Sequence, residues 1–123
     1  MKTESVSLAS EADREIISRR VFNHPRERVF AAWSDPKQLA QWWGPKGFTN
    51  TFHVFEFKPG GTWDFVMHGP DGTDYPNKSV FSEIVRPERI VFDHISAHGF
   101  QVTATFEELD GRTGVTFRML FQE

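Results

Sequence analysis

The sequence predicts an α+β fold, with a curved antiparallel sheet of about seven strands and two short helices after the first strand. From Thr49 onward, apolar and polar residues alternate in several runs, as in a sheet with one buried and one solvated face. Turn signals that contain glycine or proline divide these runs at nearly regular intervals. Two helix-start signals lie between the first strand and these runs.

The N-terminal part of the chain predicts the first strand and both helices. Residues 16–22 are rich in β-branched and aromatic side chains and predict the strand. Pro25 suits the first position of a helix, because its missing N–H needs no partner there, and this helix is predicted to reach Trp33. Asp35 is a good N-cap for the second helix, which Gly44-Pro45 ends.

The remainder predicts about six strands joined by tight turns, as in an antiparallel meander. The predicted turns are Pro59-Gly60-Gly61, Pro70-Asp71-Gly72, Arg86-Pro87-Glu88, His98-Gly99 and Asp110-Gly111. Residues 1–12 carry no sustained period and are predicted to form a flexible N-terminal tail, so that residues 13–123 form a single domain.

Composition excludes several classes of protein. The net charge of −3 argues against a protein that holds nucleic acid mainly by its overall charge. The absence of cysteine excludes disulfides, thiolate nucleophiles and cysteine-based zinc sites. No apolar run has the roughly 18 residues of a membrane span, and the N-terminus lacks the apolar stretch of a signal peptide. We therefore predict a cytoplasmic location, with neither nucleic acid nor a membrane as partner.

Aromatic residues are unusually frequent, with 13 Phe and 4 Trp in 123 residues. Each ring buries a large area, and a chain this short has a limited interior. The composition therefore predicts either a very aromatic core or an apolar cavity lined with rings.

Three blocks of the sequence resemble the activator of heat-shock-protein-90 ATPase homologue family, within the START-like (SRPBCC, Bet v 1-like) superfamily. The first block reads PRERVFAAW over residues 25–33 and ends in Trp42-Trp43-Gly44-Pro45. The second reads FKPGGTW over residues 57–63 and continues as MHGPDG over residues 67–72, and the third reads PERIVF over residues 87–92. The resemblance covers about residues 14–121.

This resemblance implies a helix-grip fold, in which a curved sheet wraps around a long C-terminal helix and encloses an apolar cavity. The sequence departs from that pattern, because it stops just after the last predicted strand and the long helix is missing. Either the chain is a truncated form or a second copy covers the open sheet face, and we expect a homodimer.

The polar residues offer few signs of catalysis. His94 shares its alternation with Ile90 and Phe92, so it could point into the apolar interior, although a strand-end histidine bonded to backbone or water is the simpler interpretation. The other histidines do not converge, and we predict no metal site and no cofactor. The arginines between Arg14 and Arg28 are interrupted by acidic residues, which favours a solvated mixed surface.

We therefore predict that the chain binds an apolar small molecule, lipid-like or aromatic, in a groove between sheet and helices. Two alternatives stay open: a co-chaperone-like module that binds a protein partner, and an enzyme of the cyclase or dehydratase type that uses the cavity. No nucleophile or triad pattern supports an enzyme, and we assign no catalytic residue. The predicted ligand-binding residues are Trp33, Trp43, Trp63, Phe65, Met67, Phe92, His94, Phe106 and Phe117.

Overall fold

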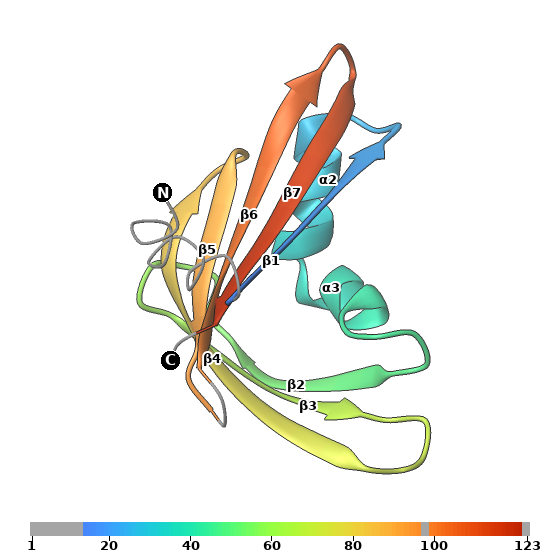
Figure 1. The fold of residues 1–123 in the computed structure, drawn as a ribbon, viewed down its shortest axis with the longest axis vertical. Coiled ribbons are helices and arrows are strands. Elements are labelled where there is room, and N and C mark those ends of the chain that lie inside the picture. The colour runs from blue at the N-terminus through green and yellow to red at the C-terminus, as the bar shows by residue number, and fades with distance from the viewer. Residues whose placement is uncertain (1–13, 97–98, 122–123) are drawn as a thin grey trace, which may run out of the picture.

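The computed structural model describes residues 14–96 and 99–121, and it has the predicted α+β architecture (Figure 1). The predicted tail over residues 1–12 and the turn residue His98 lie outside the described residues. The elements, in chain order, are β1 (Glu15–Phe22), α2 (Arg26–Ser34), α3 (Pro36–Trp42), β2 (Thr49–Phe55), β3 (Thr62–His68), β4 (Asp74–Val85), β5 (Arg89–His94), β6 (Phe100–Leu109) and β7 (Arg112–Phe121).

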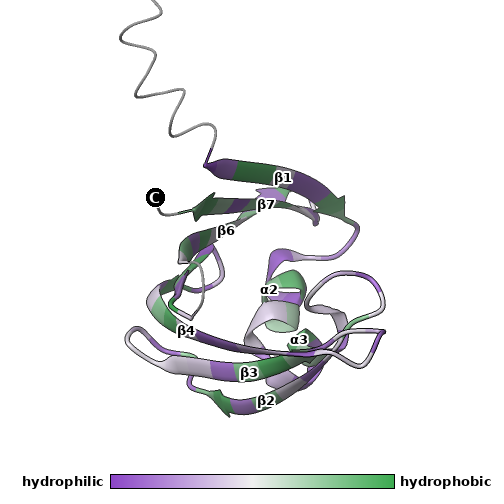
Figure 2. Ribbon diagram, turned by 60° about the horizontal axis from the view of Figure 1, so that its bottom comes forward, coloured by the Kyte–Doolittle hydropathy of each residue, from purple (hydrophilic) through white to green (hydrophobic). Residues whose placement is uncertain are grey.

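All seven strands form one antiparallel sheet in the order β1-β7-β6-β5-β4-β3-β2. Consecutive strands from β2 to β7 are neighbours, as the regularly spaced turns predict. The first strand is the exception, because it pairs with the last one, from Glu15 opposite Leu120 to Phe22 opposite Thr113. The sheet curves so strongly that its two edges, β1 and β2, lie on either side of the helices (Figures 1 and 2).

The core lies where the two helices meet the concave face of the sheet. Phe30 of α2 and Leu39 of α3 are buried there, at 1% and 2% exposure. Strands β3 to β7 contribute a layer of inward-facing rings and aliphatic side chains: Trp63, Phe65, Phe81, Ile90, Phe92, Val102, Ala104, Phe106 and Val115. The abundance of aromatic residues therefore builds a ring-rich core.

Local sequence explains how α3 begins. The carboxylate of Asp35 accepts a hydrogen bond from the backbone N–H of Lys37 over 3.0 Å, which confirms the predicted N-cap. Gln38 donates to the same carboxylate over 3.1 Å, whereas in a capping box its side chain would accept a hydrogen bond from the backbone N–H of Asp35. The Gln38 amide and then the Lys37 N–H hold the pKa of Asp35 below its ordinary value.

Two β-bulges interrupt the alternation. One lies in β2 between Phe52 and Val54, and the other lies in β4 between Phe81 and Glu83. Each adds a residue to one strand, which increases the local bend and shifts the inward-facing positions that follow.

Within the described residues, α2 and α3 are the only elements that cover the concave face of the sheet. The last described residue, Phe121, is also the last residue of β7. No described helix has the length and apolar character needed to cross a membrane.

Candidate ligand-binding site

The concave face of the sheet holds a hollow of about 360 Å3, which we call the aromatic hollow. It lies beside the C-terminal end of α3 and is walled mainly by rings and methionines. Of the described residues that line it, three contribute polar side-chain groups other than an indole N–H. The lining consists of Trp42, Trp43, Gly44, Pro45, Phe65, Met67, Asn77, Ser79, Phe92, His94, Phe100, Phe117 and Met119.

Trp43 is the central ring of this wall. Its ring centroid lies 5.1 Å from that of Trp63, 5.9 Å from that of Phe92 and 6.3 Å from that of Phe117. Tilted and edge-on contacts at such separations are favourable for aromatic pairs. Asn50 of β2 fixes the backbone here, because its amide donates to the Trp43 carbonyl over 2.9 Å and to the Ala40 carbonyl over 3.1 Å. The end of α3 is thereby tied to the sheet.

Adjacent Trp42 and Trp43 face different ways, as their spacing on a helix predicts. Trp42 is 42% exposed, and its indole N–H donates to the Ala32 carbonyl over 3.0 Å. Its ring packs edge-on against Trp33 with the centroids 4.9 Å apart. Trp42 therefore joins the two helices and forms part of the rim of the hollow.

His94 forms the polar end of the aromatic hollow. It is 8% exposed, and its Nε2 donates to Asn77 Oδ1 over 2.6 Å, with Ser96 Oγ at 3.3 Å from the same nitrogen. The imidazole stacks on the Phe100 ring with centroids 4.3 Å apart. His94 thus points inward, as its alternation predicts, and its Nε2 contacts the side chains of Asn77 and Ser96. Beside it, the Oγ of fully buried Ser79 has no hydrogen-bond partner among the described residues.

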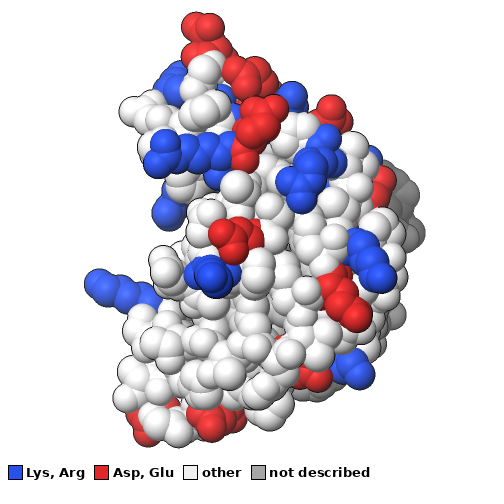
Figure 3. Space-filling view, turned by 180° about the vertical axis from the view of Figure 1, so that it is seen from behind, with Lys and Arg blue, Asp and Glu red and all other residues white. Residues whose placement is uncertain are grey.

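A second, larger hollow of about 590 Å3 lies between β1, β7 and the helices, and we call it the basic hollow. Among the described residues, its lining contains three arginines and one histidine but no acidic residue. On the face seen in Figure 3, by contrast, basic and acidic side chains are interspersed over the upper part of the molecule. The lining consists of Ser18, Arg19, Arg20, Phe22, His24, Arg28, Val29, Ala32, Trp33, Gln38, Trp42, Val115 and Phe117.

The two hollows are neighbours, because Trp42 and Phe117 line both of them. Among the nine predicted ligand-binding residues, Trp33 lines the basic hollow and Phe117 lines both. The ones that line the aromatic hollow alone are Trp43, Phe65, Met67, Phe92 and His94. The remaining two, Trp63 and Phe106, line neither hollow and are buried in the core at 1% and 2% exposure.

Sequence reasoning missed part of the lining. Phe100 and Met119 lie in runs whose alternation predicts an inward direction, so the signal was present. Asn77 and Ser79 alternate with Phe81 on β4, but the surrounding residues are too polar for this strand to read as apolar on one face. They become recognisable only through the strand register, which places Ser79 opposite His94.

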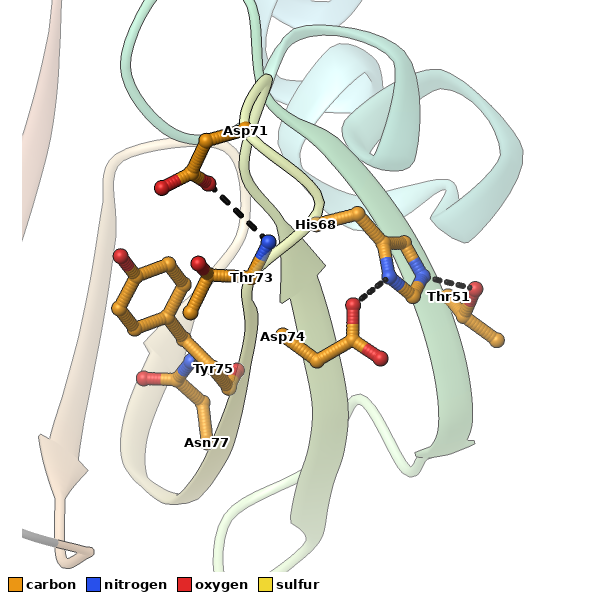
Figure 4. Close-up of polar contacts among 7 residues, drawn as sticks. All are labelled: Thr51, His68, Asp71, Thr73, Asp74, Tyr75 and Asn77. Atoms are coloured by element: carbon orange, nitrogen blue, oxygen red, sulfur yellow. Dashed lines mark hydrogen bonds and ion pairs between the residues drawn. The ribbon is translucent and has the colours of Figure 1, made fainter.

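A hydroxyl, an imidazole and a carboxylate also meet on the outer face of the sheet (Figure 4). His68 Nδ1 donates to Asp74 Oδ1 over 2.8 Å, and Thr51 Oγ1 lies 2.7 Å from His68 Nε2. This order is that of a hydrolase triad, but none of the three residues lines either hollow. The contacts connect β2, β3 and β4, and we interpret them as a cross-strand support. Among residues 14–96 and 99–121, no three His, Asp or Glu side chains are placed to hold a metal ion.

Comparison with known proteins identifies the family. The profile of the family described as "Activator of Hsp90 ATPase homolog 1-like protein" matches residues 23–123. The chain belongs to this family. No curated protein matches the chain. The resemblance carried by the three sequence blocks is thereby confirmed, together with the START-like fold that it implies.

Solved structures of bacterial proteins agree with this assignment. A protein from Arthrobacter aurescens, solved by NMR in solution, is 31% identical, with a TM-score of 0.84 over 89% of this chain and 70% of that one. A crystallised protein from Chromobacterium violaceum is 24% identical, with a TM-score of 0.82 over 89% and 80% of the two chains. One from Mycobacterium smegmatis is 24% identical, with a TM-score of 0.81 over 92% and 76%. The last two show likeness of fold alone.

Proposed function

We propose that this member of the family binds an apolar, ring-containing small molecule in the aromatic hollow. The observation that carries the proposal is the composition of the wall, in which rings surround a hollow of about 360 Å3 and a few polar groups converge at one end. Ligand sites typically measure about 300 to 1,000 Å3 and combine mostly apolar walls with a few polar groups.

The polar end indicates which group the ligand carries there. Ser79 Oγ is buried and has no hydrogen-bond partner among the described residues, while the neighbouring His94 is held by Asn77 and Ser96. A hydroxyl can donate one hydrogen bond and accept others. A ligand hydroxyl or carbonyl at this end would give Ser79 the partner that a buried polar group requires. A ring system with one such uncharged oxygen fits both the wall and the end of the hollow.

The test uses N-phenyl-1-naphthylamine, an uncharged probe whose fluorescence rises in apolar surroundings. We expect saturable binding to the wild-type protein. The Met67→Glu variant places a carboxylate in the wall of the hollow and should weaken binding at least tenfold, because an apolar ligand then borders a charge that needs water.

The matched control is Val66→Glu, which adds the same charge to the neighbouring position on the opposite face of β3. Val66→Glu should retain wild-type affinity, and circular dichroism verifies that both variants are folded. Absence of probe binding by the folded wild-type protein, or equal loss in both variants, would refute a site in the aromatic hollow.

The two alternative functions make different demands. A cyclase or dehydratase would need His94 as acid or base, so its activity on a bound cyclic compound would disappear in His94→Gln while the compound still bound. A co-chaperone-like module is suggested by the family description, and it would have to change the ATPase rate of Hsp90. Measuring that rate with and without the protein separates this alternative from ligand binding, for which no change is expected.

We also propose that the protein forms a homodimer through β1. This strand is one of the two edges of the sheet, and the side chains of Ile16 and Ile17, on its opposite faces, are 53% and 60% exposed. An exposed apolar edge strand is a template for pairing with another strand, and a second copy supplies an identical edge. Sedimentation equilibrium should give twice the 14.2 kDa chain mass, and Ile17→Lys should restore the monomer. A monomeric wild-type protein at high concentration would disprove the dimer.

A further inference from the structure

Two arginines of the basic hollow lack the acidic partners that other arginines of this protein have. Arg19, Arg89 and Arg118 form ion pairs with Glu107, Glu83 and Glu15, respectively. Within the described part of the chain, Arg20 and Arg28 form neither an ion pair nor a hydrogen bond. Both belong to the lining of the hollow, in which the structure places no acidic residue from ranges 14–96 and 99–121.

The strand register explains how neighbouring arginines come to differ. Arg20 lies opposite Val115, whose side chain is in the core, so Arg20 is on the inner face of β1. Arg19 lies on the outer face and reaches Glu107 there over 3.0 Å. Arg28 approaches the hollow from the first turn of α2, where the helix dipole adds to the positive potential. Two cationic groups from different elements therefore border one hollow.

The remaining lining shows what kind of anion suits the hollow. Val29, Ala32, Trp33 and Val115 give it apolar walls, and Ser18 and Gln38 add uncharged polar groups. A guanidinium binds a carboxylate or a phosphate through paired N–H donors. Of the two, a carboxylate carries the smaller charge and costs less free energy to bring against apolar walls. A carboxylate attached to an apolar body would pair with the arginines and pack against the apolar walls.

We infer that Arg20 and Arg28 bind the carboxylate of an apolar monocarboxylic acid whose apolar body extends over Trp42 and Phe117 into the aromatic hollow. The continuity of the two hollows supports the path, because these two side chains line both. The inference rests on the proposed function for its apolar end. It adds the charge class of the ligand and the position of its head group.

The experiment compares decanoate with decan-1-ol, which has the same chain length but no charge, by isothermal titration calorimetry. Wild-type protein should bind decanoate about tenfold more tightly than decan-1-ol, since hydrogen bonds to charged groups are the stronger ones. Arg20→Gln and Arg28→Gln should each weaken decanoate binding about tenfold and leave decan-1-ol within twofold. Both arginines are exposed, so these variants should fold, which circular dichroism verifies.

The matched control is Arg112→Gln, which removes the same charge at an exposed position that lines neither hollow. Equal affinity for decanoate and decan-1-ol would overturn the inference, and so would an equal loss in Arg112→Gln, since overall charge would then explain the preference. If N-phenyl-1-naphthylamine binds in the aromatic hollow while decanoate shows no dependence on Arg20 and Arg28, the inference fails and the proposed function stands. If decanoate binding depends on the arginines but the naphthylamine does not bind, the proposed function fails and the head-group site stands.

Discussion

Trp63 lies directly opposite Ser79 in the ladder between β3 and β4, and the polar atoms of both side chains are buried without a hydrogen-bond partner among the described residues. Ser79 in turn lies opposite His94 in the ladder between β4 and β5. This row of three residues crosses the floor of the concave face, from the core to the polar end of the aromatic hollow. Buried polar groups without a partner lower stability, so the row marks a place where stability and binding compete.

Replacing Ser79 by alanine should therefore leave the free energy of unfolding unchanged or raise it by up to about 1 kcal/mol, because a buried unpaired hydroxyl is removed. Thr113→Val is the matched control. Thr113 is equally buried, but its hydroxyl donates to the His24 carbonyl over 2.7 Å, so this change should cost about 1 to 3 kcal/mol. Urea unfolding measures both values. A loss of stability in Ser79→Ala as large as that in Thr113→Val would contradict the prediction.

Phe30→Ala should destabilise the protein by about 3 to 5 kcal/mol, because it removes a ring from the contact between α2 and the sheet. Phe30 is 1% exposed, and its ring meets that of Phe106 edge-on with centroids 5.2 Å apart. Ile95→Ala is the control, since that side chain is 54% exposed and should change stability by about 0.5 kcal/mol or less. Thermal unfolding followed by circular dichroism compares the two, and similar melting temperatures would show that α2 is not packed as described.

Gly61→Ala should be more damaging than Gly72→Ala, although both glycines lie in turns that the sequence predicts. A Cβ atom at Gly61 would lie in the space of the Glu56 carbonyl, so the turn between β2 and β3 would have to open. Gly72 has φ +88° and open space around it, so alanine there carries only the cost of a left-handed backbone, about 1 to 2 kcal/mol. Chemical denaturation of both variants checks this order, and the reverse order would show that the turn accommodates the methyl group.

The capping of α3 should make stability depend on pH in a known direction. The pKa of Asp35 is lowered from its ordinary value of 3.8 by the hydrogen bonds from Gln38 and Lys37. A lowered pKa means that the carboxylate form of Asp35 stabilises the folded state. Its contribution to the free energy of unfolding is complete above pH 3.8 and is lost as the pH falls through the lowered pKa. Asp35→Ala should therefore be less stable than wild type at pH 6, and the difference should shrink below pH 3.8. A difference that stays constant down to pH 2 would assign the effect to something other than this carboxylate.

Elements with local causes could be predicted from the sequence. The cap at Asp35, the turns at Pro59-Gly60-Gly61 and Asp110-Gly111 and the alternation of β3 all depend on neighbouring residues, and the structure confirms them. The pairing of β1 with β7 was not predicted, because no local signal connects strands that lie so far apart in the sequence.

The site was predictable only in part, for reasons that can be named. Alternation places Met67 and His94 on the inner face, and both line the aromatic hollow. Asn77 and Ser79 were missed because the residues around them on β4 are too polar to indicate an apolar face, and only the strand register places Ser79 opposite His94. The Asn50 amide holds the Trp43 carbonyl through a hydrogen bond between β2 and the end of α3, and this contact depends on how the two elements pack in the tertiary fold. The order of charges in the sequence predicted a mixed surface for the arginines of β1. It could not show which of them pair with acidic residues on other strands, as Arg19 does with Glu107.

The ladder between β1 and β7 also determines when this protein can finish folding during its synthesis. Glu15 and Arg118, which form an ion pair across the ladder, are 103 residues apart in the chain. At about 5 to 20 residues per second, a ribosome needs roughly 5 to 20 seconds to make that stretch. Until β7 has been translated, β1 has no strand to pair with. Once β1 has left the ribosome, its isoleucines are therefore available to chaperones that bind nascent apolar segments. A change that slows translation of the codons for β6 and β7 would lengthen this period without altering a single amino acid.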